Sequence, residues 1–256
     1  DRTSPGHLAK YLPSSAEFLA LRKRLKSLPD HDFIMAQSMG KSSVVTGFSL
    51  VSESNLSRPL NRTGYLFSTQ NLNEDLTDYL PPFYSGAVCN LPVLEDSTRG
   101  NGCINNFPDP DGVIRRVPLL YRLGQQPVPS LAAEAVRVYS GSSGYKVKLG
   151  GGSGSLSFGA KTGISQVKIG SYVVPTDSQG HVLLYDSGTK PQRFIPFWKI
   201  LEKKFDPLEV AGKIIFIGTS AVGLKDQRVT PLSQAGAGVE IHAQIAEQIL
   251  SQKFLH

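Results

Sequence analysis

The 256-residue sequence has no long apolar run, and even its segment 213–218 holds only four consecutive apolar residues. A helix that crosses a bilayer needs about 20. The sequence also lacks a recognisable secretory leader and an initiator methionine, since it begins at Asp1. We therefore expect a soluble part of a longer protein, with any membrane anchor outside these residues.

Cysteines are scarce: Cys89 and Cys103 form neither a Cys-x-x-Cys pair nor part of a histidine-rich cluster. The sequence thus gives no basis for a metal site or a cofactor, and a chain of this length can bury a core without covalent staples. In an oxidising compartment the two thiols could close a short loop before the segment 109–112. Two buried free thiols are the alternative.

Aromatic side chains are absent from the densest basic cluster, which consists of Arg22, Lys23, Arg24 and Lys26. A protein that binds single-stranded nucleic acid would interleave such cations with aromatic rings on which bases stack. The chain has 27 Lys and Arg against 21 Asp and Glu, a formal net charge of +6. We interpret the cluster as the solvated face of a helix and expect no nucleic-acid partner.

Glycine and proline are abundant, with 25 and 17 residues, and 40% of the chain is hydrophobic. This composition predicts a globular domain with many turns, and hence strands as well as helices. We expect one domain, 1–256, of the α/β class, with a mixed β-sheet, packed helices, hairpins and a long glycine-rich loop at 150–159. The expected helices are 14 or 15 to 28, 32–39, 130–139, 194–205 and 239–250, and the expected strands are 43–50, 103–106, 113–123, 166–175, 181–185 and 213–218.

The segment 106–122 reads NFPDPDGVIRRVPLLYR and predicts a type I turn at 109–112. A cation site at its two aspartates would have too few oxygens. In the strand that follows, alternation places Arg115 and Arg116 on opposite faces, so one of them should approach the core. A buried guanidinium needs a carboxylate or an anionic ligand, and we favour an internal ion pair. The conceivable partners are Asp109, Asp111, Asp226 and Glu240.

The segment 218–223 follows an expected buried strand, where α/β folds often bind ligands. Thr219 and Ser220 could contribute to an anion site there, although the segment lacks a phosphate-binding fingerprint. It also lacks the Gly-x-Ser-x-Gly elbow of hydrolases. Ser220, Asp226 and His242 supply the residue types of a catalytic triad, so a serine hydrolase remains a remote alternative.

The segment 236–250 predicts a helix in which Glu240 complements the positive amino-terminal end of the helix dipole. A polar stripe follows one side of this helix, whereas His242 lies on its apolar side. We interpret His242 as a core histidine. If it is only partly buried, it could instead titrate near neutral pH and respond to pH. The stripe consists of Glu240, Gln244, Glu247 and Ser251.

Together, the motifs 106–122, 213–232 and 236–250 resemble the class-two CHASE sensor domain in order and spacing. Segments 44–48 and 129–134 resemble further parts of that family, so the resemblance covers almost the whole chain. It implies the extracytoplasmic, periplasmic part of a bacterial inner-membrane receptor, which is not itself an enzyme. Such receptors carry a cytoplasmic output domain, and the helix at 130–134 with the glycine-rich segment looks most like cyclase-linked members.

The resemblance also implies an unknown small-molecule or ionic stimulus and a homodimer, but no particular ligand. A dimerisation module that binds no ligand is the alternative from another class. The ligand-binding candidates are Asp109, Asp111, Arg115, Arg116, Thr219, Ser220, Asp226, Glu240 and His242.

Overall fold

The computed structural model describes residues 4–68, 75–80, 83–149, 163–220, 223 and 226–255. The glycine-rich segment 150–159, expected to form a loop, lies outside the described residues. Helices and strands alternate along the chain, and the sheets contain both parallel and antiparallel pairs. The expected α/β class with mixed sheets is therefore confirmed.

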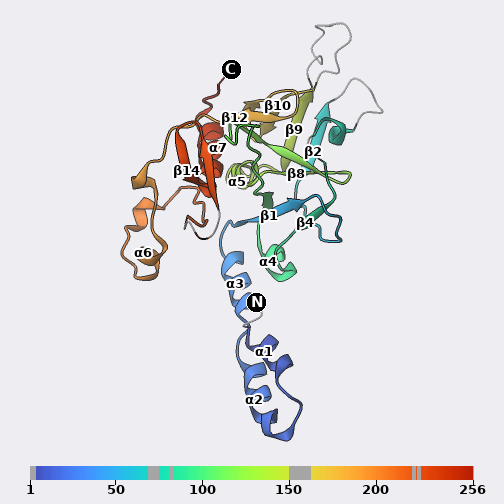
Figure 1. The fold of residues 1–256 in the computed structure, drawn as a ribbon, viewed down its shortest axis with the longest axis vertical. Helices are drawn as coiled ribbons and strands as arrows, with labels where there is room; N and C mark the ends of the chain where they lie inside the picture. Colours follow the sequence, from blue (N-terminus) through green and yellow to red (C-terminus); the bar gives the residue numbers. More distant parts are fainter. Residues whose placement is uncertain are drawn as a thin grey trace.

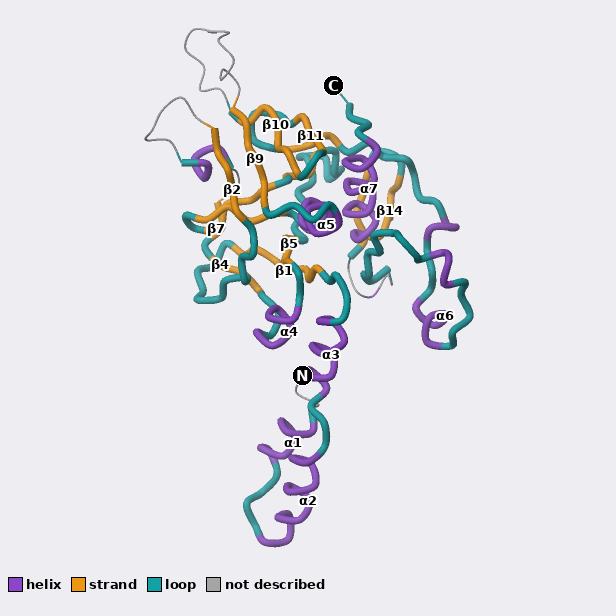
Figure 2. Tube along the Cα trace, turned by 180° about the vertical axis from the view of Figure 1, so that it is seen from behind, coloured by secondary structure: helices purple, strands orange, loops and turns teal. Residues whose placement is uncertain are grey.

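Three amino-terminal helices form an arm that projects from the rest of the molecule in both views (Figures 1 and 2). They are α1 (Pro5–Tyr11), α2 (Ala16–Ser27) and α3 (His31–Gly40). The carboxylate of Asp30 caps α3, because it accepts hydrogen bonds from two backbone N–H groups at 2.9 and 3.2 Å. α2 and α3 confirm the two helices expected here, although α2 buries none of its residues.

A three-stranded sheet follows the arm, with β1 (Val45–Val51) between β4 (Gly86–Val88) and β5 (Gly100–Cys103). β1 confirms the strand expected at 43–50, whereas β5 ends where the strand expected at 103–106 should begin. α4 (Pro92–Ser97) connects β4 to β5, and α5 (Leu131–Tyr139) packs on β5. The packing is close: a Cβ atom built on Gly102 would lie 2.5 Å from the Cα atom of Leu131.

The main core lies between a four-stranded sheet and two helices, α5 and α7 (Gly238–Ser251). Ile241, Ile245 and Ile249 recur every four residues along α7 and are buried, as one face of a helix requires. Both helices confirm those expected at 130–139 and 239–250. The sheet has the order β11–β10–β9–β2, and its strands are β2 (Gly64–Ser68), β9 (Gly144–Leu149), β10 (Ile164–Ile169) and β11 (Tyr172–Pro175).

Two residues of α5 form a buried ion pair. The guanidinium of Arg137 donates to both carboxylate oxygens of Glu134, at 2.7 and 2.8 Å, and the hydroxyl of Tyr145 donates to the same carboxylate at 2.7 Å. Glu134 and Arg137 side chains are 1% and 8% exposed. Burial by itself would lower the pKa of Arg137, but the carboxylate of Glu134 raises it, so Arg137 stays charged.

The strand expected at 113–123 is wrong, because the chain divides there between two sheets. β6 (Arg116–Pro118) pairs with β12 (His181–Leu183), while β7 (Leu120–Leu123) joins a different sheet. The strand expected at 166–175 likewise divides into β10 and β11, with Gly170 at the turn (φ +58°). The remaining strands are β3 (Phe83–Tyr84) and β8 (Gln126–Pro129) beside β7, and the hairpin of β13 (Gln227–Thr230) and β14 (Ser233–Ala237).

The buried strand expected at 213–218 is also wrong. The segment is irregular, with Ile214 and Phe216 packed against the core and Ile215 and Ile217 exposed at 53% and 84%. Successive side chains alternate between packed and exposed, as in a strand, but the segment pairs with no strand among the described residues. The helix expected at 194–205 is shorter, at α6 (Phe197–Leu201). Short 3₁₀ helices occur at Leu76–Tyr79, Pro191–Arg193 and Pro207–Glu209.

Candidate functional site

The three sequence motifs meet around the amino-terminal half of α7. Val113, after the Asp-Pro-Asp-Gly turn, pairs with Val229 of β13, and the N–H of Ile114 donates to the Val229 carbonyl at 2.8 Å. The N–H of Leu184 donates to the carbonyl of Arg115 at 2.8 Å. The β13–β14 hairpin lies beside α7 in both views (Figures 1 and 2). Segments far apart in sequence thus enclose one helix.

Arg115 forms its ion pairs within the turn, with two of the four expected partners. Its guanidinium lies 3.0 Å from a carboxylate oxygen of Asp109 and 2.7 Å from one of Asp111. Gly112 has a φ of +85° and donates its N–H to the Asp109 carbonyl at 2.8 Å, which closes the predicted turn. The hydrogen bonds from Arg115 and from the Val113 N–H lower the pKa of Asp111 to about 2.

Neither arginine approaches the core, contrary to the expectation from strand alternation. The side chains of Arg115 and Arg116 are 41% and 55% exposed. Ile114 and Val117 are both buried although they lie three residues apart. In a continuous strand every second side chain faces the core, so this alternation is interrupted between them. The chain is not a continuous strand here, and both arginines fall on the outer side of the interruption.

Asp186 is the centre of a polar cluster that the sequence analysis missed. One carboxylate oxygen accepts from the Thr230 hydroxyl at 2.6 Å and from the Leu232 N–H at 2.9 Å. The other accepts from the Gly188 N–H at 2.9 Å and from the side-chain amide of Gln244 at 3.4 Å. Burial would raise the pKa of Asp186, but these hydrogen bonds outweigh it and hold the pKa below its usual value.

Polar side chains of α7 continue this cluster along the helix. Glu240 accepts from the Thr189 hydroxyl at 3.0 Å, and Glu247 accepts two bonds from Arg193, at 2.6 and 2.8 Å. Gln248 is 3% exposed; its amide donates to the Leu183 carbonyl at 2.8 Å, and its oxygen accepts from the backbone N–H of residue 185 at 3.0 Å. Three of the four residues of the expected polar stripe, Glu240, Gln244 and Glu247, therefore bind the segment 186–193. The fourth, Ser251, bonds to the Gln248 carbonyl within the helix, and Gln248 itself was not predicted as part of the stripe.

His242 is a core histidine, as we expected. It is 4% exposed, its ring bonds to the backbone of Ile104, and its Nδ1 has no hydrogen-bond partner among the described residues. Burial lowers the pKa of His242 to about 4, and because the ring is almost fully buried, the condition for titration near neutral pH is not met.

The remaining candidates do not assemble a catalytic triad in the described part of the chain. Thr219 and Ser220 are exposed, whereas His242 is buried. Asp226 lies 3.3 Å from the guanidinium of Arg228. Its backbone carbonyl accepts from the N–H of Gly238, where α7 begins. The structure thus gives Asp226 a structural role at the start of the helix and gives no support to a hydrolase.

The two cysteines are free thiols on opposite sides of β1. Phe48 pairs with Cys103, and Ser49 pairs with Val88, the residue before Cys89. Two strand spacings place the cysteine backbones about 10 Å apart, whereas a disulfide spans at most about 7 Å between Cα atoms. Burial raises the pKa of Cys89 to about 11 and that of Cys103 to about 12, so both are protonated thiols at neutral pH.

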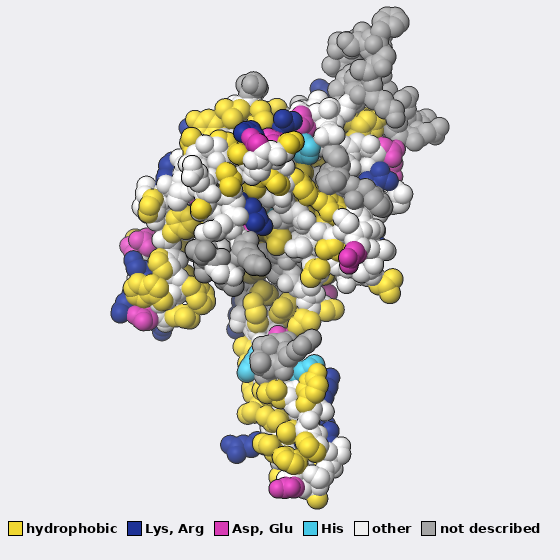
Figure 3. Space-filling model, in the orientation of Figure 1, with side chains coloured by type: hydrophobic (Ala, Val, Ile, Leu, Met, Phe, Trp, Pro, Cys, Tyr) yellow, Lys and Arg dark blue, Asp and Glu magenta, His cyan; other side chains and the backbone are white. Residues whose placement is uncertain are grey.

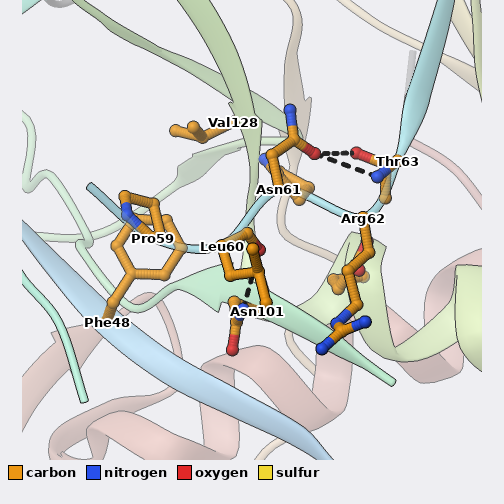
Figure 4. Close-up of a pocket in the computed structure, with 10 residues that line it drawn as sticks. Phe48, Pro59, Leu60, Asn61, Arg62, Thr63, Asn101 and Val128 are labelled. Atoms are coloured by element: carbon orange, nitrogen blue, oxygen red, sulfur yellow. Dashed lines mark hydrogen bonds between the residues drawn. The ribbon is translucent and has the colours of Figure 1, made fainter. Parts of the chain in front are cut away.

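Two hollows differ in what they can hold. The one between β1 and the segment 59–63 has a volume of about 10 Å³, room for one water molecule (Figure 4). There the amide of Asn101 donates to the Leu60 carbonyl at 2.8 Å. The other is a groove of about 400 Å³ beside β6 and β12, within the range of ligand sites. It is lined by Arg116, Pro175, Thr176, Asp177, His181, Leu183 and Leu255.

Within the described ranges, no helix combines the length and apolar composition that a bilayer crossing requires, and no three His, Cys, Asp or Glu side chains could hold a metal ion. The family model described as CHASE2 domain matches residues 13–256, so the chain belongs to the CHASE2 family. CHASE2 domains are typically extracytoplasmic sensory domains of signalling proteins. No curated protein and no solved structure matches the chain.

Proposed function

We propose that this domain receives a signal outside the cytoplasmic membrane of a bacterium and that α7 passes the signal to a cytoplasmic nucleotide cyclase in the same protein. The observation that supports the proposal is the set of polar bonds between α7 and the segment 183–193. A helix that only filled the core would not need two buried amide side chains, those of Gln244 and Gln248, and carboxylates bonded to that segment.

These bonds give the helix a way to respond to its surroundings. Gln248 is bound at both ends of its amide to backbone groups near Leu183, and Glu247 is bound to Arg193. A stimulus that displaces the segment 183–193 must either carry α7 with it or break these bonds, at about 1 kcal/mol each. Two arrangements that differ by a few such bonds are close enough in free energy for a ligand to select one.

The choice of a cyclase rests on the resemblance of the segment 130–134 and of the glycine-rich segment to cyclase-linked members of the family. It predicts that membranes containing the complete receptor form cyclic AMP or cyclic GMP. Membranes with abundant receptor and no cyclase activity would contradict it.

An alkaline phosphatase fusion within the domain should be active, since that enzyme folds only outside the cytoplasm, and an inactive fusion would contradict the proposed location.

The role of α7 is tested by Gln248→Leu in the complete receptor. The substitution removes two hydrogen bonds to the backbone of Leu183 and Tyr185, so we expect the basal output to change by about tenfold or more. Gln37→Leu is the matched control, because Gln37 is an exposed residue of α3. An unchanged output in both variants, at equal amounts of receptor in the membrane, would contradict the proposal.

A homodimeric module without a ligand is the second candidate, favoured by apolar side chains on the surface. They gather over the arm and around α6 (Figure 3). Phe33 is 55% exposed, Phe197 63% and Trp198 52%. Native mass spectrometry of the purified domain separates the two candidates. A dimer without any bound species would favour the module, and an additional noncovalent mass would favour ligand sensing.

A further inference from the structure

The groove beside β6 and β12 has two cationic or basic side chains at one end of an apolar surface. In the β6–β12 pair, Leu183 lies opposite Arg116, and His181 follows two residues away on the same face. The neighbouring pair, Val117 and Val182, is buried in the core, so the groove residues occupy the outer face. Strand geometry therefore holds Arg116, His181 and Leu183 side by side.

Arg116 is the less engaged of the two adjacent arginines. Its one ion-pair partner in the described part of the chain is Asp109, with 3.8 Å between Nε and the carboxylate oxygen, too long for a hydrogen bond. The other oxygen of that carboxylate already binds Arg115 at 3.0 Å. Both terminal nitrogens of Arg116 are thus free to donate, and their planar fork matches an oxyanion.

His181 is oriented by a carboxylate that is itself satisfied. Asp177 accepts from the Nδ1 of His181 at 3.0 Å and from the backbone N–H groups of Gln179 and His181 at 2.9 Å each. The bond to Nδ1 fixes the ring, so that Nε2 is the nitrogen left to contact a ligand. Asp177 also lines the groove, but its two carboxylate oxygens are already occupied by these three hydrogen bonds.

Apart from Asp177 and Thr176, the rest of the groove lining is apolar. Leu183 and Leu255 are 39% and 47% exposed there, and Pro175 completes this part of the wall. We propose that the groove binds a small soluble organic anion, whose carboxylate or phosphate contacts Arg116 and His181 and whose compact apolar body contacts the two leucines. An inorganic anion would contact only Arg116 and His181, and a neutral apolar molecule would contact only the two leucines.

The position of Leu255 links this site to α7. The helix ends at Ser251, and Gln252 follows it with a φ of +52° that turns the chain. The side-chain oxygen of Gln252 accepts from the N–H of Val173 on β11. Phe254 packs against the core, and Leu255 then forms the groove wall. A ligand in the groove contacts the segment that directly follows α7. The signalling consequence of binding rests on the proposed function, whereas binding itself does not.

Calorimetry on the purified domain tests the site with phenyl phosphate, inorganic phosphate and benzyl alcohol. We expect saturable binding of phenyl phosphate, at least tenfold weaker binding of the other two, and at least a tenfold loss in Arg116→Gln. Leu255→Ala should weaken the binding of phenyl phosphate but not that of inorganic phosphate. Arg58→Gln removes the same charge outside the groove and should change neither, with circular dichroism confirming that every variant is folded.

Absence of saturable binding at 10 mM phenyl phosphate, or equal binding by the wild type and Arg116→Gln, would overturn the proposal. The outcome is separate from the test of the proposed function. An output response to Gln248→Leu without binding in the groove would remove only the ligand site. Binding in the groove together with an unresponsive output would remove only the signalling role of α7.

Discussion

The buried histidine of α7 predicts how stability depends on pH. Burial lowers the pKa of His242 from 6.5 to about 4 in the folded protein. Below pH 6.5 the unfolded chain binds a proton at this residue and the folded chain does not, so the free energy of unfolding decreases as the pH falls toward 4. With these two pKa values, the decrease between pH 7.5 and pH 5 is about 2 kcal/mol. For a domain of this size, that lowers the Tm by roughly 4–8 °C.

Urea denaturation at the two pH values measures this decrease, and His242→Gln isolates it. The glutamine retains a donor for the backbone of Ile104 but does not titrate, so the variant should lose about 2 kcal/mol less than the wild type between pH 7.5 and pH 5. The two proteins share every other side chain, so the contributions of the other residues cancel in this comparison. The hydrogen-bonded carboxylates of Asp186 and Glu247 have pKa values below the usual range and contribute mainly below pH 5. Equal decreases in both proteins would refute the reasoning.

Three further predictions concern the core. Glu134→Leu should lower the free energy of unfolding by about 3–5 kcal/mol, because it leaves the charge of Arg137 buried, and the double variant with Arg137→Leu should lose less than the single one in urea denaturation. Thiol titration of unreduced protein in denaturant should find Cys89 and Cys103 both free, and a disulfide would contradict the register of β1 with its neighbours. Gly102→Ala should cost about 1–3 kcal/mol in the same denaturation assay, because a methyl group meets the backbone of α5, and an unchanged midpoint would show that α5 can shift.

Features that depend only on residues close together in the sequence could be predicted. The turn at 109–112 needs only its own aspartate, proline and glycine, and the structure closes it with a bond between Gly112 and Asp109. α5 begins where the Ser130 hydroxyl accepts the N–H of Ala133, and it is followed by Gly141 with a φ of +67°. Such signals are local, so no knowledge of the fold is required to use them.

Features that depend on pairing could not be predicted in the same way. The segment 213–218 has the composition of a buried strand. A strand also needs a neighbouring strand with which to pair, and the composition of the segment does not say whether one is present. The faces of Arg115 and Arg116 were inferred from a strand that does not continue through them. Alternation is a valid guide only within an unbroken ladder.

The candidate site was predicted in part. Arg115 and its aspartate partners were identified from charge and spacing, and the stripe on α7 from helical period. Asp186 was missed because its four donors come from segments 188, 230–232 and 244, which only the fold brings together. Its position directly after the strand expected at 181–185, before Ser187 and Gly188, was the one available signal.

Hydrogen–deuterium exchange of the purified domain, with and without saturating phenyl phosphate, tests most directly whether α7 responds to the groove. We predict slower exchange both in the groove strands β6 and β12 and in residues 238–255, because Leu255 and the bonds of Gln248 connect the two. Protection limited to β6 and β12, with unchanged exchange along α7, would contradict the account.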